Sequence, residues 1–142
     1  MAPAVVVDTS VAAKWFFPEP DSSGADAVLE ELSSGKSSLA APDLIVYEFA
    51  NLLWKRVGRG EISADQAGSV MDDFMRLPIS LAPADILAES ALGIALQTGC
   101  TAYDATFIAL AEYLDTYVFT ADRKLIQLLS ATKHARRARL PG

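Results

Sequence analysis

The chain has 142 residues, of which 51% are hydrophobic and 21% are charged, and its formal net charge is −6 at pH 7. These values predict a globular protein with one hydrophobic core, and they argue against a disordered chain and a general polyanion-binding surface. The only cysteine is Cys100 and the only histidine is His134, which excludes an internal disulfide and a Cys/His zinc site. Because the apolar stretches are too short to span a membrane and the N-terminus lacks a signal-peptide pattern, we expect a cytoplasmic protein.

Short strands and longer helices alternate along the chain. Strand patterns occur at residues 4–7, 38–41, 77–81 and 117–120. Helical patterns occur at residues 9–15, 21–34, 43–57, 63–76, 83–99, 101–114 and 122–131. Since no short turn joins two strands into a hairpin, this order predicts a three-layer α/β/α fold with a central parallel sheet of four or five short strands.

Particular residues are expected to begin or end the predicted helices. Asp43 is a predicted N-cap, and Ser63 and Gln66 fit a capping box. Pro83 suits the first turn of a helix, and Gly99 suits a helix end.

Four acidic residues occupy positions where a carboxylate is unusual. Asp8 directly follows the valine strand and Asp122 follows the last predicted strand, and sites in open α/β sheets form at such strand ends. Asp104 begins the apolar stripe of one predicted helix, and Glu48 lies on the apolar face of another. Structural explanations stay open, because Asp8 and Asp122 could cap helices. Glu48 could pair with an arginine or lie at the edge of its apolar face.

If the four carboxylates converge on one cleft, their mutual repulsion requires a counter-ion. Mg²⁺ and Mn²⁺ prefer oxygen ligands, and Mg²⁺ usually keeps several waters beside one or two carboxylates. Such an ion activates water and neutralises a phosphate, while a carboxylate that is not fully bound to the ion can orient the water or accept its proton. The pattern therefore predicts phosphoryl chemistry that depends on Mg²⁺ or Mn²⁺.

Four stretches, VVVDTSVAAKW, LIVYEFANLLWK, YDATFIALA and TADRKL, resemble in order and spacing the PIN-domain ribonucleases, most closely the VapC-type toxins of type II toxin–antitoxin systems. The resemblance covers nearly the whole chain. It implies that the catalytic and metal-binding residues are Asp8, Glu48, Asp104 and Asp122, supported by the hydroxyls of Thr9, Ser10 and Thr120. The basic residues that we expect to bind RNA are Lys14, Arg56, Arg123, Lys124, Arg136 and Arg137, and Lys55 and Arg59 lie in the same basic cluster as Arg56. Any of these could instead lie on a solvated helix end.

The same resemblance implies an endoribonuclease that needs Mg²⁺ or Mn²⁺, cleaves structured RNA such as tRNA or rRNA, and inhibits growth. It also implies a homodimer and a cognate VapB-type antitoxin, whose C-terminal segment lies along a groove of the toxin and can place a basic residue in the site. Trp15, Phe16 and Phe17 could line such a groove or pack in the core. Trp54 and Tyr47 could contribute to the same groove.

The C-terminus departs from the resemblance. The family usually ends in a short strand, whereas KHARRARLPG has little β pattern. We therefore assign residues 1–132 to a single PIN-like domain and residues 133–142 to a basic tail that contacts RNA or is disordered, while a weak last strand stays open.

Two other functions compete with the endoribonuclease. One is a catalytically inactive PIN-like module that binds RNA or a partner, although four intact acids argue against it. The other is an aspartate-based phosphatase or receiver domain. A phosphatase needs a second aspartate two residues after the first, where this chain has Ser10, and a receiver needs an acidic pair after its first strand.

Overall fold

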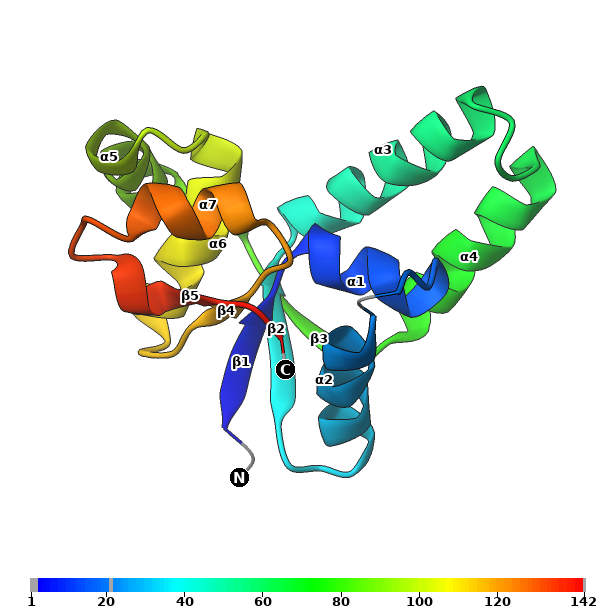
Figure 1. The fold of residues 1–142 in the computed structure, drawn as a ribbon, viewed down its shortest axis with the longest axis horizontal. Coiled ribbons are helices and arrows are strands. Elements are labelled where there is room, and N and C mark those ends of the chain that lie inside the picture. Colours follow the sequence, from blue (N-terminus) through cyan, green and yellow to red (C-terminus); the bar gives the residue numbers. More distant parts are fainter. Residues whose placement is uncertain (1–2, 21, 142) are drawn as a thin grey trace.

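The computed structural model describes residues 3–20 and 22–141. Within these residues, five parallel strands form one sheet in the order β3-β2-β1-β4-β5 (Figure 1). The strands are β1 (Ala4–Val7), β2 (Ser38–Pro42), β3 (Ile79–Ala82), β4 (Val118–Phe119) and β5 (Ala138–Arg139).

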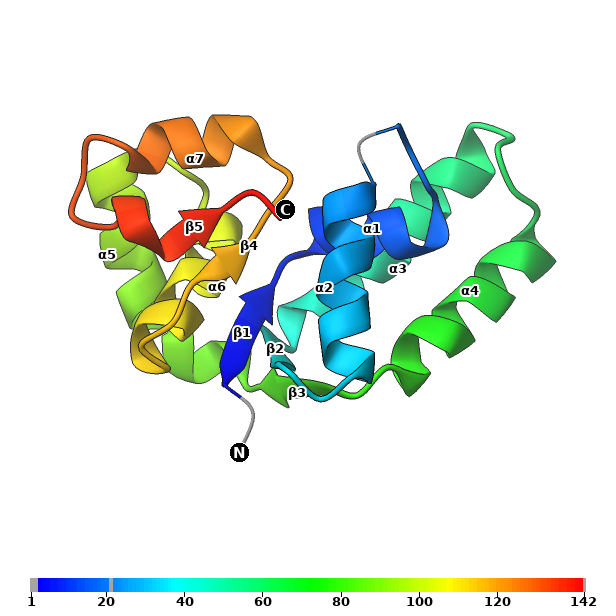
Figure 2. The same ribbon diagram turned by 60° about the horizontal axis from the view of Figure 1, so that its bottom comes forward.

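Helices cover the sheet on two sides. They are α1 (Thr9–Phe16), α2 (Ser23–Ser33), α3 (Leu44–Gly58), α4 (Ala64–Arg76), α5 (Ala88–Thr98), α6 (Ala102–Tyr113) and α7 (Arg123–Leu129), with short 3₁₀ helices η1 (Ala84–Leu87) and η2 (Ala135–Arg137). Figures 1 and 2 show α1 to α4 on one side of the strands and α5 to α7 on the other. This arrangement confirms the predicted α/β/α fold. In the described part of the chain, no helix is long and apolar enough to cross a membrane.

Local signals explain several helix ends. Ser63 and Gln66 form the predicted capping box of α4. Gly99 ends α5 with a φ of 82°, in the left-handed region that favours glycine. Asp43 precedes α3, but its carboxylate accepts a hydrogen bond from the backbone N–H of Ala84 (3.0 Å) and does not cap α3. The predicted cap therefore joins the start of α3 to the turn after β3.

The core lies on both faces of β1. Residues 5–7 are buried as predicted, and residues 105–111 of α6 are buried around the whole helix. The sequence predicted one apolar face for this helix, but α6 packs against strands of the sheet and against α5.

Phe49 of α3 stacks on Phe74 of α4 with ring centroids 4.1 Å apart, and Phe16 meets both rings edge-on. Phe16 therefore packs against the core, one of the two roles left open.

The C-terminal segment is part of the sheet. Strand β5 pairs in parallel with β4, with Val118 opposite Ala138 and Phe119 opposite Arg139. Thr120 N donates a hydrogen bond to the carbonyl oxygen of Arg139 (2.9 Å). The weak last strand that the sequence left open is therefore present at Ala138–Arg139, whereas contact of residues 133–142 with RNA stays a prediction. Its β pattern is weak because only two residues pair, and the edge of β4 supplies their partners.

Candidate functional site

Asp8 lies where β1 ends and α1 begins. Its Oδ1 accepts hydrogen bonds from Ser10 Oγ (2.5 Å) and Val11 N (3.2 Å), so Asp8 caps α1. The residue is only 9% exposed. Burial raises the pKa of Asp8 to about 6, and the charge of Asp104 adds to this effect. Hydrogen bonds from Ser10, Thr120 and Val11 lower the pKa by less. Capping is therefore confirmed, but the carboxylate remains costly to ionise.

Glu48 lies on α3 at the edge of its buried face. The buried residues of this helix are Ile45, Phe49 and Leu53. Glu48 is half-buried beside them, which was one of the explanations left open. Thr9 Oγ1 donates a hydrogen bond to Glu48 Oε1 (2.8 Å). Burial still raises the pKa of Glu48 above its ordinary value, and the charge of Asp104 adds to the effect.

Asp104 and Asp122 face one cleft of about 270 Å³, which Lys124 also lines. Asp104 lies in the first turn of α6, and Asp122 caps α7 by accepting a hydrogen bond from Leu125 N (3.1 Å). Burial raises the pKa of Asp104, and the charge of Asp122 raises it further. Asp122 itself is exposed. The capping role left open for Asp122 is confirmed, as it is for Asp8.

The supporting hydroxyl groups link the ends of β1 and β4. Ser10 Oγ donates to Asp8 and accepts a hydrogen bond from Ala121 N (2.9 Å). It also lies 3.4 Å from Thr120 Oγ1. Thr120 is fully buried, and its Oγ1 accepts a hydrogen bond from Asp122 N (3.0 Å). The two strand-end acids are therefore connected through two hydroxyl side chains.

The structure brings the four acids into one electrostatic group with Asp104 at its centre. The charge of Asp104 raises the pKa values of Asp8 and Glu48, and Asp122 raises that of Asp104. Among residues 3–20 and 22–141, however, no three His, Cys, Asp or Glu side chains are arranged to ligate one metal ion. An all-oxygen donor set still fits Mg²⁺ or Mn²⁺, because these ions bind one or two carboxylates and keep several waters. The residues therefore fit an open, water-rich site and not a closed cage.

A groove of about 370 Å³ extends from Glu48 along α3. Its lining residues are Thr9, Glu48, Asn51, Leu52, Lys55, Arg56 and Arg59. The sequence already places Lys55 and Arg59, with Arg56, in a basic cluster that could contact RNA, whereas it did not single out Asn51. Asn51 lies three residues after Glu48 and four residues before Lys55, and this helical spacing could have identified it. Arg56 also contacts Glu61 (3.1 Å) and lies over the ring of Phe17 (4.0 Å).

The other predicted RNA-binding residues lie at different places. Lys14 is buried, pairs with Glu19 (3.1 Å) and lines a small cavity of about 90 Å³ together with Arg123. Lys124 lines the cleft between Asp104 and Asp122. Of these residues, Lys124 is therefore the one that lines a cleft together with two of the acids.

The two arginines of η2 differ from each other. Arg136 is exposed, whereas Arg137 Nη1 donates to the carbonyl oxygen of Thr116 (2.8 Å) and to Asp115 Oδ1 (3.3 Å). The guanidinium of Arg137 is therefore engaged within the chain.

Comparisons with known proteins give a consistent result. Residues 5–129 match the family profile of the PIN domain. The chain is 33% identical over 130 residues to the curated Ribonuclease VapC3 of Pyrobaculum aerophilum, a match that covers 89% of this chain and 95% of that protein.

Two crystal structures share the fold. PAE2754 from Pyrobaculum aerophilum is similar with a TM-score of 0.66 and 26% identity, over 95% of this chain and 89% of that one. VapC20 from Mycobacterium tuberculosis, described as a sarcin-ricin loop cleaving toxin, is similar with a TM-score of 0.65 and 16% identity, over 93% of this chain and 98% of that one.

Proposed function

The chain belongs to the PIN domain family, as its four motifs predicted, and on this premise we propose that it is an endoribonuclease that hydrolyses RNA phosphodiester bonds with Mg²⁺ or Mn²⁺. We further propose that it is a VapC-type toxin, which inhibits growth and is neutralised by a cognate antitoxin. The similarity to Ribonuclease VapC3 over most of both chains supports this proposal.

The observation that carries the proposal is the grouping of four carboxylates from separate elements around Asp104. Burial and mutual charge raise the pKa values of Asp8, Glu48 and Asp104, so full ionisation of the group is unfavourable without a cation. Asp122 belongs to the same group and faces the same cleft as Asp104. If these acids served only to cap helices, four of them would not need to lie in one region.

When bound, Mg²⁺ or Mn²⁺ would activate a water molecule and neutralise charge on the phosphate. The side chains of this protein supply the orientation. Thr9 holds Glu48, and Ser10 holds Asp8, each through a hydrogen bond to a carboxylate oxygen. A carboxylate oxygen of Asp8, Glu48, Asp104 or Asp122 that is not bound to the ion would orient the attacking water and accept its proton.

We propose that the RNA backbone lies along the α3 groove and crosses the acids toward Lys124. Lys55, Arg56 and Arg59 line the groove beside Glu48, and Lys124 lines the cleft on the other side. Cations on both sides of an acidic centre can hold the phosphates that flank the cleaved bond. The family resemblance favours structured RNA, such as tRNA or rRNA, as the substrate.

An antitoxin would fit a second groove of about 370 Å³ between α3 and α4, which is lined almost entirely by apolar atoms. Trp54, predicted to face a partner, lies in its wall and is 70% exposed. Apolar grooves between helices receive the apolar face of a partner helix. The homodimer likewise remains a proposal that rests on the family resemblance.

The test is cleavage of total RNA by the purified protein, freed of any partner. We expect cleavage with Mg²⁺ or Mn²⁺, none with EDTA, and none by Asp8→Asn or Asp104→Asn. Asp72→Asn, which changes an exposed acid on α4, is the matched control and should cleave normally.

Circular dichroism must show that both inactive variants are folded. Continued cleavage by folded Asp8→Asn or Asp104→Asn would refute the role of the acids. A wild-type protein that binds RNA but never cuts it would favour the inactive module, and stoichiometric beryllofluoride binding at Asp8 would favour the phosphatase or receiver.

A further inference from the structure

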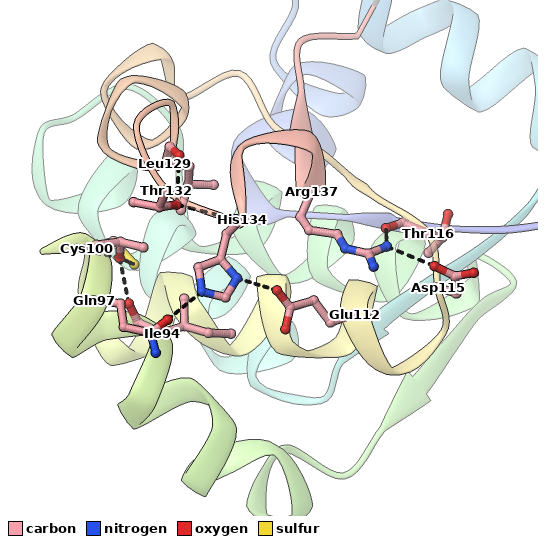
Figure 3. Close-up of polar contacts among 11 residues, drawn as sticks. Ile94, Gln97, Cys100, Glu112, Asp115, Thr116, Leu129, Thr132, His134 and Arg137 are labelled. Carbon is pink, nitrogen blue, oxygen red and sulfur yellow. Dashed lines mark hydrogen bonds and ion pairs between the residues drawn. The ribbon is translucent and has the colours of Figure 1, made fainter.

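His134 is the one histidine of the chain, and it is buried, at 3% exposure. Its ring lies between two helices of the α5–α7 side (Figure 3). His134 Nδ1 contacts Oε1 of Glu112 on α6, and Nε2 lies 2.7 Å from Oε1 of Gln97 on α5. Both ring nitrogens are therefore engaged, and neither points into the clefts that hold the acids.

The ring belongs to the segment that leads into β5. The backbone N–H of His134 donates to Thr132 Oγ1 (3.1 Å), and three residues later Arg137 contacts Asp115 and Thr116 in the turn after α6. Figure 3 shows these contacts on either side of the same short turn. The segment is thus fastened to α5, to α6 and to the turn between α6 and β4.

From β5 the contacts continue to the acids. The carbonyl oxygen of Arg139 accepts a hydrogen bond from Thr120 N (2.9 Å), and Thr120 Oγ1 accepts one from Asp122 N (3.0 Å). Asp122 is therefore two hydrogen bonds away from the strand that His134 anchors. The other end of the anchor is Glu112, on the helix that begins with Asp104 in its first turn.

We propose that His134 is a positioning residue that fixes Asp122 relative to Asp104 across their shared cleft. This inference rests on the proposed function for its catalytic consequence. A metal-dependent hydrolysis requires both carboxylates at a fixed separation. A displacement of one carboxylate by about 1 Å can reduce the rate by up to a hundredfold. The His134 ring itself does not touch RNA or the reacting atoms.

The main variant is His134→Ala, and the first readout is amide hydrogen exchange without RNA. We expect the amide of Thr120 to exchange at least about tenfold faster than in the wild type, after correction for the change in global stability, because its partner strand is loosened. The amide of Val6, which donates to Tyr117 in the sheet centre, should change only with global stability.

The second readout is RNA cleavage. In His134→Ala, we expect kcat to fall about tenfold or more and KM to stay within about twofold, since the groove that binds RNA is unchanged. His134→Gln keeps a donor toward Glu112 and should recover most of the loss. The matched control is Val28→Ala on α2, which removes two buried methyl groups on the α1–α4 side of the strands. It should lower the Tm but leave kcat and local exchange at Thr120 unchanged.

If His134→Ala does not fold, Gln97→Ala removes one of the two ring contacts and should give the same pattern with smaller changes. The proposal is overturned if exchange at Thr120 follows global unfolding in the folded variants while kcat stays within about twofold. A wild-type protein that cleaves no RNA would instead refute the proposed function, and the exchange measurement would still decide whether His134 fixes the Asp122 loop.

Discussion

Asp8→Asn is expected to stabilise the protein while it abolishes activity. Asp8 is buried and its pKa is raised from the ordinary aspartate value of 3.8 to about 6, with burial as the largest cause. An asparagine keeps the oxygen that accepts hydrogen bonds from Ser10 and Val11, so the cap of α1 survives. The substitution therefore removes the buried charge and little else.

The magnitude follows from the pKa difference. One pKa unit corresponds to about 1.4 kcal/mol, so ionising Asp8 in the folded protein costs about 3 kcal/mol relative to the unfolded chain. Because the folded pKa lies above the unfolded value, the contribution of Asp8 to stability is most favourable below about pH 4 and is lost as the pH rises to about 6. The loss persists at higher pH.

The assay is thermal unfolding followed by circular dichroism in EDTA. At pH 8 the Tm of Asp8→Asn should exceed that of the wild type by about 10 °C, and at pH 4 the difference should nearly vanish. Adding Mg²⁺ should reduce the difference in Tm at pH 8, because an ion that binds only the folded wild type stabilises it. Asp72→Asn, which removes an exposed charge on α4, is the control and should gain no stability. The reasoning would be refuted if the difference in Tm at pH 8 were absent, reversed or equal to the difference at pH 4.

Other changes test the core, a cap and the proposed RNA path. Phe49→Ala should lower the free energy of unfolding by about 3–5 kcal/mol in urea, because Phe49 is fully buried; a loss below about 1 kcal/mol would contradict its place in the core. Ser63→Ala removes the capping box and should lower the free energy of unfolding by about 1 kcal/mol in a thermal scan, with unchanged cleavage; an effect on kcat would show that α4 influences the site. Lys55→Ala and Arg59→Ala should each weaken RNA binding and reduce the slope of log affinity against log salt by about 1; equal slopes for wild type and variants would exclude these residues from phosphate contact.

The sequence alone predicted the seven helices and the first four strands, and it singled out the candidate acids. The valine run of β1, the capping box at Ser63 and the end of α5 at Gly99 are signals carried by residues within about one helical turn, and each appears as expected. Asp8 and Asp104 were recognisable because a carboxylate beside an apolar pattern is uncommon.

The tertiary structure decided the rest, because it depends on residues far apart in the chain. Only packing could show that Glu48 lies at the edge of its buried face, where Thr9 from another helix holds it. Strand β5 has almost no pattern of its own, since two residues pair with an edge supplied by β4, and a buried His134 anchors the segment. Backbone propensity and capping act over a few residues, whereas the separation of two carboxylates is set by the whole core between them.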